Sequence, residues 1–282
     1  MICVDTIESL RAQLAQWRRA GDRILLVPTM GNLHQGHLKL AHEAKRRGGR
    51  LVVSIFVNPM QFGAGEDFAS YPRTLERDRA LLETAGADLL FTPDEKTVYP
   101  RGRAGHVEVS VPGLSGELCG ASRPGHFTGV ATVVCKLFHM VQPDLALFGE
   151  KDFQQLLVIR RMAADLDIPV EIIGVATERE PSGLAMSSRN QYLSEDERQR
   201  AALLYRVLQG LAEDLKLGEA DYPALEREAA RRLSEGGFAP DYVSVRRAAD
   251  LSVPGPEEPD LVVLAAARLG KARLIDNLRV ER

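Results

Sequence analysis

Short apolar runs alternate with longer helical patterns along the first two-thirds of the chain. The run Arg23–Val27 (RILLV) predicts a strand, and Leu51–Val57 (LVVSIFV) predicts a second one with almost no polar interruption. Such a composition is typical of a strand whose two faces are both buried. Shorter runs predict further strands at Asp88–Phe91, Asp144–Phe148 and Val170–Val175.

Helical spacing of the apolar residues separates these strands. It predicts helices over Gly36–Arg47, Thr74–Ala85 and Phe153–Leu166. The stretch Phe127–Val141 is ambiguous, because its Thr and Val residues suit a strand while its length suits a helix; we interpret it as a helix. Strand–helix alternation indicates βαβ units, so we expect an α/β fold with a doubly wound parallel sheet over residues 1–177.

The pattern changes after residue 177. A polar, turn-rich segment over residues 177–194 is typical of a linker or an active-site loop. Two amphipathic helices are predicted after it, at Glu195–Leu215 and Tyr222–Leu233. Strands are then predicted at Tyr242–Val245, Leu261–Ala266 and Arg273–Ile275. Helices followed by strands predict a smaller α+β domain over residues 178–282.

Composition restricts the classes of protein to consider. Of the 282 residues, 45% are hydrophobic and 27% are charged, and the net charge is −3, so a nucleic-acid partner is not expected. Cys3, Cys119 and Cys135 lie far apart, which argues against a disulfide framework and for a reducing compartment. Asp5 and Glu8 precede any apolar block, and no apolar stretch approaches the ~20 residues that span a bilayer, so we expect a cytoplasmic protein without a membrane partner.

The first candidate site is PTMGNLHQGHLKL, which follows a predicted strand and opens a predicted helix. A glycine-bearing turn of this kind can direct backbone N–H groups and a helix dipole at a phosphate. His34 and His37, at i and i+3, share a helical face and can donate to phosphate oxygens. Two other readings stay open: His-x-x-His can bind zinc, although no cysteine or carboxylate triad is nearby, or both residues can be surface histidines.

The second candidate site, NPMQF, also follows a strand. The amides of Asn58 and Gln61 can donate to and accept from the hydroxyl or carboxylate of a small polar substrate. An ordinary Asn-Pro turn is the alternative reading.

Two further polar segments complete the set of candidates. In GEKDFQQ, Lys151 provides a point charge for phosphate, Asp152 suits a helix N-cap or a ribose hydroxyl, and Gln155 lies one turn further on. In MSSRN, Ser187 and Ser188 offer hydroxyls, and the forked cation of the next residue, Arg189, can bind phosphate oxygens. A solvated polar loop is the alternative reading for MSSRN.

Together these segments resemble the pantothenate synthetase (pantoate–β-alanine ligase) family over nearly the whole chain. PTMGNLHQGH is similar to the His-x-Gly-His signature of nucleotidylyltransferases and class I aminoacyl-tRNA synthetases, and MSSRN to their Lys-Met-Ser-Lys-Ser loop. FVNPMQFG, SRPGHFTGVATVV, LFGEKDFQQ and GLAMSSRNQYL, in this order, are specific to the pantothenate enzymes. The resemblance implies a Rossmann-like first domain and condensation of pantoate with β-alanine through a pantoyl adenylate, with release of AMP and pyrophosphate.

The resemblance also implies roles for individual residues. It makes His37 the proton donor and gives His34 and Lys151 catalytic contacts with phosphate. It assigns pantoate to Gln61 and Gln155, supported by Asn58. It assigns ATP to Met30, Gly31, Asn32, Leu33, His34, Gln35, Gly36, His37, Gly149, Glu150, Lys151, Asp152, Glu178, Met186, Ser187, Ser188 and Arg189.

One position departs from the family pattern. Glu178 stands where the family usually carries an aliphatic residue whose backbone meets the adenine, and Arg123 is an additional candidate cation on the substrate side.

Mg²⁺ is expected with ATP, held mainly by nucleotide oxygens rather than by protein ligands. The resemblance further implies a homodimer. The alternatives are another nucleotidyltransferase of the superfamily and a non-catalytic nucleotide-binding module.

Overall fold

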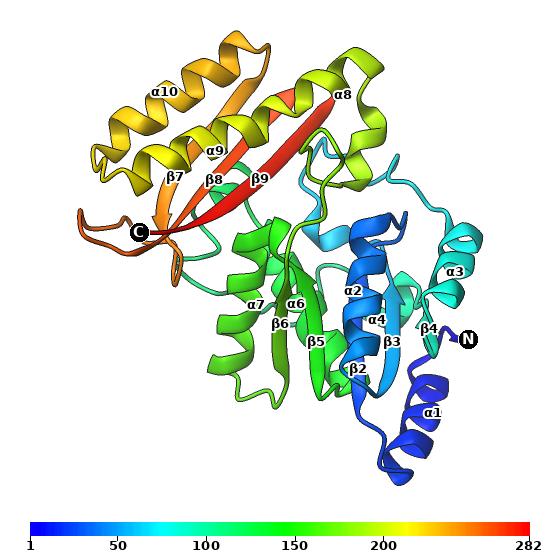
Figure 1. Ribbon diagram of the computed structural model, residues 1–282. Helices are drawn as coiled ribbons and strands as arrows, with labels where there is room; N and C mark the ends of the chain where they lie inside the picture. The colour runs from blue at the N-terminus through cyan, green and yellow to red at the C-terminus, as the bar shows by residue number, and fades with distance from the viewer. The chain divides into compact units, whose positions relative to one another are not determined.

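The structure is a computed structural model that describes residues 1–282 (Figure 1). The chain divides into two compact units. Unit 1 comprises Met1–Glu150 and Val158–Ala176, and unit 2 comprises Lys151–Leu157 and Thr177–Arg282. The segment Lys151–Leu157, which lies within the first expected domain, therefore groups with unit 2.

A six-stranded parallel sheet forms the centre of unit 1. Its strands are β1 (Ile2–Val4), β2 (Ile24–Thr29), β3 (Arg50–Ile55), β4 (Leu89–Phe91), β5 (Leu145–Gly149) and β6 (Glu171–Val175). Their order across the sheet is β1-β4-β3-β2-β5-β6, and every pairing is parallel. The predicted α/β class with a doubly wound parallel sheet is confirmed.

The apolar runs are explained by burial on both faces of this sheet. Leu25, Val27, Leu51 and Val53 belong to the same core cluster as the apolar side of helix α2 (Gln35–Arg46). Their neighbours along each strand are equally buried and, because side chains alternate, lie on the opposite face. Two buried faces leave few polar positions to interrupt the run, which is why these strands are readable from the sequence.

The direction of winding reverses between β2 and β5. From β2 the chain proceeds outward through β3 and β4, and it then returns to place β5 and β6 on the other side of β2. In sheets of this kind, ligands bind beyond the carboxyl ends of the strands at such a reversal. The residues that directly follow β2 therefore occupy the position where a ligand is expected.

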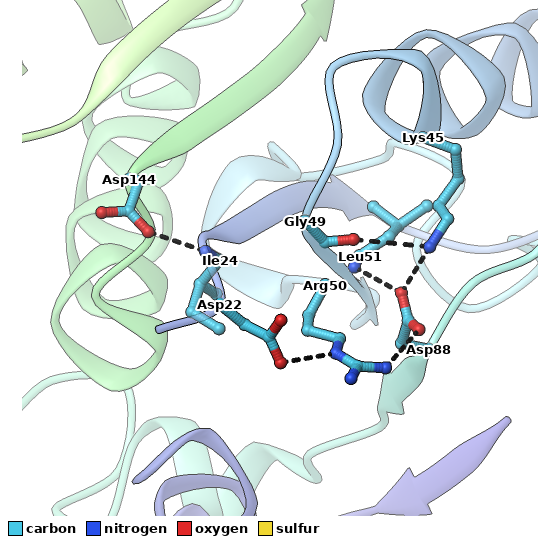
Figure 2. A network of polar contacts seen from close by, with 8 residues as sticks. All are labelled: Asp22, Ile24, Lys45, Gly49, Arg50, Leu51, Asp88 and Asp144. Carbon is cyan, nitrogen blue, oxygen red and sulfur yellow. Dashed lines mark hydrogen bonds and ion pairs between the residues drawn. The ribbon is translucent and has the colours of Figure 1, made fainter. Parts of the chain in front are cut away.

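Aspartates secure the opposite, amino-terminal ends of the central strands. Asp144, just before β5, accepts the N–H of Ile24 at the start of β2 at 2.7 Å. Asp88, just before β4, accepts the N–H of Leu51 in β3 at 2.8 Å and the Lys45 ammonium at 2.8 Å (Figure 2). Each carboxylate thus satisfies an N–H group near the start of a neighbouring strand.

The helices of unit 1 connect successive strands. They are α1 (Ile7–Arg19), α2 (Gln35–Arg46), α3 (Leu75–Thr84), α4 (Glu95–Val98), α5 (Cys119–Ser122), α6 (His126–Val141) and α7 (Phe153–Asp165), of which α7 begins in unit 2. Short 3₁₀ helices are η1 (Pro59–Gln61) and η2 (Glu150–Asp152). The ambiguous stretch that we interpreted as a helix is α6, whereas β1 and α1 were not predicted.

Unit 2 is a three-stranded antiparallel sheet covered by two long helices. Its elements are η3 (Ser188–Tyr192), α8 (Glu195–Ala201), α9 (Leu203–Lys216), α10 (Tyr222–Glu235), β7 (Ala239–Arg247), β8 (Asp260–Leu269) and β9 (Ala272–Glu281). The single helix expected over Glu195–Leu215 is wrong in one respect, because it is interrupted at Ala202. Ala202 keeps near-helical backbone angles, φ −61° and ψ −19°, and no Gly or Pro marks the interruption. The predicted α+β class of this part is confirmed.

No helix of the chain combines the length and the hydropathy needed to cross a membrane.

Candidate active site

The turn from β2 to α2 brings the two candidate histidines together. His34 is the N-cap of α2 and His37 lies in its first turn, with ring centroids 4.1 Å apart. The N–H of Gly36 donates to Nδ1 of His34 at 3.1 Å, and the N–H of His34 donates to Nδ1 of His37 at 3.3 Å. Since each Nδ1 accepts, the neutral rings carry their protons on Nε2, away from the helix backbone.

The backbone of the same turn does not behave as the sequence led us to expect. We expected its N–H groups to be directed outward at a phosphate, but the buried carboxylate of Asp78, on α3, accepts those of Asn32 and Leu33 at 2.8 Å each. The N–H of Gly31 donates to the Thr29 hydroxyl at 3.2 Å. A protein carboxylate therefore occupies this concave set of donors, and these N–H groups are paired within the protein.

Gly31 fits this arrangement for steric reasons. Its φ of +81° lies in the left-handed region, and a Cβ there would meet Ile55 Cγ2 at 3.0 Å and Asp78 Oδ2 at 3.1 Å. A side chain at this position would strain the backbone and displace the carboxylate that holds the turn.

The amides of NPMQF form a network in which one side chain orients the other. Asn58 is 1% exposed, and its Nδ2 donates to Gln61 Oε1 and to the Gly129 carbonyl, both at 3.1 Å. Gln61 is half-buried, and its Nε2 donates to Met30 Sδ at 3.0 Å. Asn58 is thus too buried to be a main ligand contact, and Gln61 is the amide presented beside the β2–α2 turn.

Two residues that the sequence did not single out complete this network. The hydroxyl of Tyr99 donates to Asn58 Oδ1 at 2.8 Å, and burial raises the pKa of this phenol, which keeps it protonated. Gly129 in α6 passes so close to η1 that a Cβ would lie 2.2 Å from the Met60 carbonyl oxygen. A glycine is therefore required where the helix meets the NPMQF turn.

The guanidinium of Arg123 is bound by other groups of the protein. It forms a two-pronged ion pair with Glu66, at 2.6 and 2.7 Å, and donates to the Gln61 carbonyl at 3.2 Å. His126 Nδ1 lies 2.7 Å from the same carbonyl. Burial favours the neutral form of Glu66, but Arg123 outweighs it and lowers the pKa of Glu66 to about 2. Arg123 therefore holds the backbone at Gln61, rather than standing as an open cation.

The GEKDFQQ segment continues from β5 through η2 into α7. Gly149 ends β5, and Glu150, Lys151 and Asp152 form η2. Lys151 Nζ lies 3.8 Å from Asp152 Oδ1, and the two side chains are 17% and 46% exposed, respectively. Asp152 therefore precedes α7 directly, from a 3₁₀ turn, and Gln155 is half-buried in the first part of that helix.

The polar segment after Thr177 is an ordered turn. The Met186 N–H donates to the Glu178 carbonyl at 2.9 Å, and Arg179 bridges to Ala185. Ser187 is the N-cap of η3, its hydroxyl accepting the Arg189 N–H at 3.3 Å. The structure thus folds MSSRN back along the chain that precedes it.

Within unit 2, a small cavity joins two of the candidate segments. Its volume is about 10 Å³, and Lys151, Ser187, Asn190 and Asp276 are among the side chains that line it. Within unit 1, the β2–α2 turn and Gln61 are joined through Met30. No group of three or more His, Cys, Asp or Glu side chains is arranged to hold a metal ion in residues 1–282.

The paired imidazoles follow a central strand of a doubly wound parallel sheet, at the position where α/β enzymes with such sheets bind nucleotides and other ligands. Direct comparison is more specific. The family model described as "Pantoate-beta-alanine ligase" matches residues 2–279, and the chain belongs to this family. Enzymes of this kind are ligases that form pantothenate through a C–N bond, with cleavage of ATP to AMP.

Individual relatives are similar to this chain over nearly their full length. Pantothenate synthetase of Shewanella loihica is 58% identical over 282 residues, covering 100% of both chains, and that of Thioalkalivibrio sulfidiphilus is 59% identical over 281 residues, covering 100% of this chain and 98% of its own. The crystal structure of pantothenate synthetase from Thermus thermophilus superposes with a TM-score of 0.93 at 47% identity, covering 100% of both chains. That of the Francisella tularensis ligase, described as complexed with "Beta-gamma ATP and Beta-alanine", has a TM-score of 0.84 at 33% identity, covering 99% of this chain and 97% of its own.

Proposed function

We propose that this chain forms pantothenate in two steps, through an enzyme-bound pantoyl adenylate. The observation that carries the proposal is the pair of adjacent imidazoles, His34 and His37, whose Nδ1 atoms both accept backbone N–H groups. This arrangement supports two Nε2–H donors, fixed in orientation and adjacent, at the reversal point of a parallel sheet. Donors that are oriented before the reaction stabilise developing charge without reorganisation.

In the first step, a carboxylate oxygen of pantoate attacks the α-phosphorus of ATP. The bond from that phosphorus to the bridging oxygen of the β-phosphate breaks, and pyrophosphate leaves with the electron pair. His34 and His37 donate hydrogen bonds from Nε2–H to the phosphate oxygens, and His37, the proton donor that the family resemblance implies, shares its proton in this bond without losing it, because the ring is neutral. Gln61 and Gln155 hold the hydroxyls and carboxylate of pantoate, so that positioning and electrostatic stabilisation supply the rate enhancement.

In the second step, the β-alanine amine attacks the acyl carbon of the mixed anhydride. A C–N bond forms, the amine releases a proton to water, and the bond from the acyl carbon to the phosphate oxygen breaks, so that AMP leaves with the electron pair. Binding of the nucleotide is assigned to the turn Met30–His37, Gly149–Asp152, the Glu178 backbone and the loop Met186–Arg189, with Lys151 and Arg189 on phosphate.

Three further proposals rest on the family resemblance. ATP enters as its Mg²⁺ complex, with the ion held mainly by phosphate oxygens and water. The chain forms a homodimer, which sedimentation equilibrium tests. It acts in the cytoplasm, which fractionation of the source cells tests.

Isotope exchange tests the two-step scheme. Incorporation of labelled pyrophosphate into ATP is expected with pantoate present and β-alanine absent, because the adenylate forms reversibly before the amine enters. Exchange that requires β-alanine would overturn the adenylate pathway. AMP release from the complete mixture should require both pantoate and β-alanine.

Substitution of the histidines tests their assignment. His37→Ala should lower the exchange rate by about a hundredfold or more with little change in pantoate affinity, because the lost interaction strengthens at the transition state. His42→Ala, in the same helix, is a matched control and should leave exchange unchanged. An unaltered exchange rate in His37→Ala would remove His37 from the mechanism.

A further inference from the structure

Two segments assigned to the nucleotide's phosphates are attached to consecutive residues of a C-terminal strand. Lys151 precedes α7, and Ser187–Arg189 belong to the polar loop, so they lie far apart in the sequence. Both nevertheless connect to β9, where Asp276 holds the loop and Asn277 holds Lys151. All of these residues belong to unit 2.

The first connection is a buried ion pair. Arg179 donates to both carboxylate oxygens of Asp276, at 2.6 and 2.9 Å, and to the Gly183 carbonyl at 3.1 Å. Its guanidinium lies over the Tyr205 ring, 3.6 Å from the centroid. The Asp276 side chain is only 2% exposed, so breaking this pair would leave a buried charge unpaired.

The ion pair fixes more than Arg179 itself. Arg179 bridges to Ala185, and the Glu178 carbonyl accepts the Met186 N–H, so the start and the end of the turn are paired backbone to backbone. A fixed Arg179 therefore fixes the residues immediately before Ser187.

The second connection is a hydrogen bond to the backbone of Lys151. Asn277 Nδ2 donates to the Lys151 carbonyl at 2.8 Å, and the Asn277 N–H donates to Asp276 Oδ1 at 2.8 Å. Asn277 is 8% exposed, so water does not readily replace the lost donor if this amide is removed.

The alternation of a β-strand explains how neighbouring residues reach two segments. Consecutive side chains of a strand point to opposite faces of the sheet. Leu274 and Ala272 share the face of Asp276 and belong to the apolar core of unit 2. Asp276 thus reaches the loop from the core face, and Asn277 reaches Lys151 from the other.

We infer that Asp276 and Asn277 are positioning residues that set the placement of the MSSRN loop and of Lys151 relative to each other. The cavity lined by Lys151, Ser187 and Asp276 lies where the two segments meet. This inference rests on the proposed roles of Lys151 and the loop in binding phosphate.

A double-mutant cycle tests the Asn277 connection. Asn277→Ala should lower kcat/KM for ATP about ten- to a hundredfold, because small misplacements of a catalytic group are costly. In a Lys151→Ala background the same substitution should change kcat/KM by less than about twofold, since no ammonium remains to be positioned. Equal losses in both backgrounds would overturn the inference while leaving the role of Lys151 intact. Full activity of Lys151→Ala alone would instead overturn the assigned role of Lys151.

The Arg179 connection has its own variant and control. Arg179→Lys keeps the positive charge but cannot form the two-pronged ion pair with Asp276, so it should raise the KM for ATP several-fold. In a Ser187→Ala, Arg189→Ala double variant, Arg179→Lys should cause no further increase in this KM. Ser244→Ala removes a partly buried hydrogen bond to Glu226 elsewhere in unit 2. Ser244→Ala should lower the Tm by about as much as Arg179→Lys does, but it should leave kcat/KM for ATP unchanged. A kinetic loss in Ser244→Ala equal to that of Arg179→Lys would show that general destabilisation, not positioning, is responsible.

Discussion

Asp78 holds Asn32 by its backbone: a carboxylate that is 1% exposed accepts the Asn32 N–H at 2.8 Å, and its other oxygen accepts the next N–H along the chain. Asn32 has a φ of +51°, a left-handed conformation that few residues other than glycine adopt. The carboxylate thus stabilises a backbone shape that the chain would not favour alone, and this shape leads directly into His34.

Asp78→Asn should therefore weaken both the fold and the nucleotide site. The new NH₂ group faces a backbone N–H, and the resulting unpaired donor should cost about 1–3 kcal/mol of the free energy of unfolding. We also expect the KM for ATP to rise, since the turn that orients the histidines loosens. Chemical denaturation and steady-state kinetics measure the two effects.

The exposed Glu76 in the same first turn of α3 provides the control. Glu76→Gln removes one negative charge from this turn without breaking the contact to the β2–α2 backbone. Asp78→Asn with wild-type stability and wild-type KM for ATP would contradict the structural role of the carboxylate.

Gly129→Ala should perturb pantoate binding from a position outside the site. The added Cβ would lie 2.2 Å from the Met60 carbonyl oxygen and 2.8 Å from the Gln61 nitrogen, so η1 must move. We expect the KM for pantoate to rise by about tenfold or more, because a displaced side chain loses its oriented contact.

Gly210→Ala is the matched control, since Gly210 also lies inside a helix, α9. The atom nearest to its Cβ position is the end of the flexible Arg232 side chain, at 3.1 Å. This substitution should be tolerated or add up to about 1 kcal/mol of stability, given the better helix propensity of alanine. Equal behaviour of the two variants in the pantoate assay would contradict the steric argument.

The contrast between Asp78 and the readable strands shows what the sequence can and cannot indicate. Runs such as Leu51–Val57 are visible because burial on both faces removes nearly every polar residue, Ser54 being the exception in this run. Asp78, in TLERD, has the same local pattern as a solvated carboxylate in the first turn of a helix, because its partners come from a distant turn. β1 was missed for a related reason, since Ile2–Val4 is a partly exposed edge strand of three residues.

In the candidate site, too, some residues could be predicted from the sequence and others could not. The motifs with glutamine, histidine and lysine were visible because each follows a predicted strand at the sheet edge where ligands bind. The residues that orient them, Tyr99 and Asn277 among them, have partners set by tertiary structure alone. No spacing in the sequence encodes such a pair.

Gln61→Ala should raise the KM for pantoate by about tenfold, as expected when a buried polar group on a ligand loses its partner. Tyr99→Phe removes the hydroxyl that donates to Asn58, one step further away. It should therefore raise the same KM by a smaller factor and leave the KM for ATP unchanged. A larger increase in the KM for pantoate in Tyr99→Phe than in Gln61→Ala would contradict the proposal that Gln61 contacts pantoate directly while Tyr99 acts only through Asn58.

The Glu66–Arg123 ion pair should make the protein sensitive to acid. The pKa of Glu66 is lowered from 4.5 to about 2, chiefly because Arg123 outweighs the opposing effect of burial. A lowered pKa in the folded state contributes stability above pH 4.5, and this contribution is lost as the pH falls from 4.5 towards 2. Glu66→Gln should lower stability at pH 7 by about 2 kcal/mol, allowing for partial exposure, and the difference from wild type should shrink with falling pH. A gap that stays constant from pH 7 to pH 3 in urea titrations would contradict this linkage.

Substitution of Asp144 should affect stability but not catalysis, because this residue lies at the amino-terminal ends of the strands, opposite the ends that carry the histidines. Its carboxylate accepts the first N–H of β2 at 2.7 Å (Figure 2). Asp144→Ala leaves that N–H unpaired and should cost about 1–2 kcal/mol, whereas Asp144→Asn keeps an acceptor and should cost less. Both variants should keep the wild-type kcat and KM values at a temperature well below their Tm, because nothing at the carboxyl ends of the strands depends on this bond. If Asp144→Ala lowered the pyrophosphate exchange rate as strongly as His37→Ala, the reacting groups could not be confined to the carboxyl edge of the sheet.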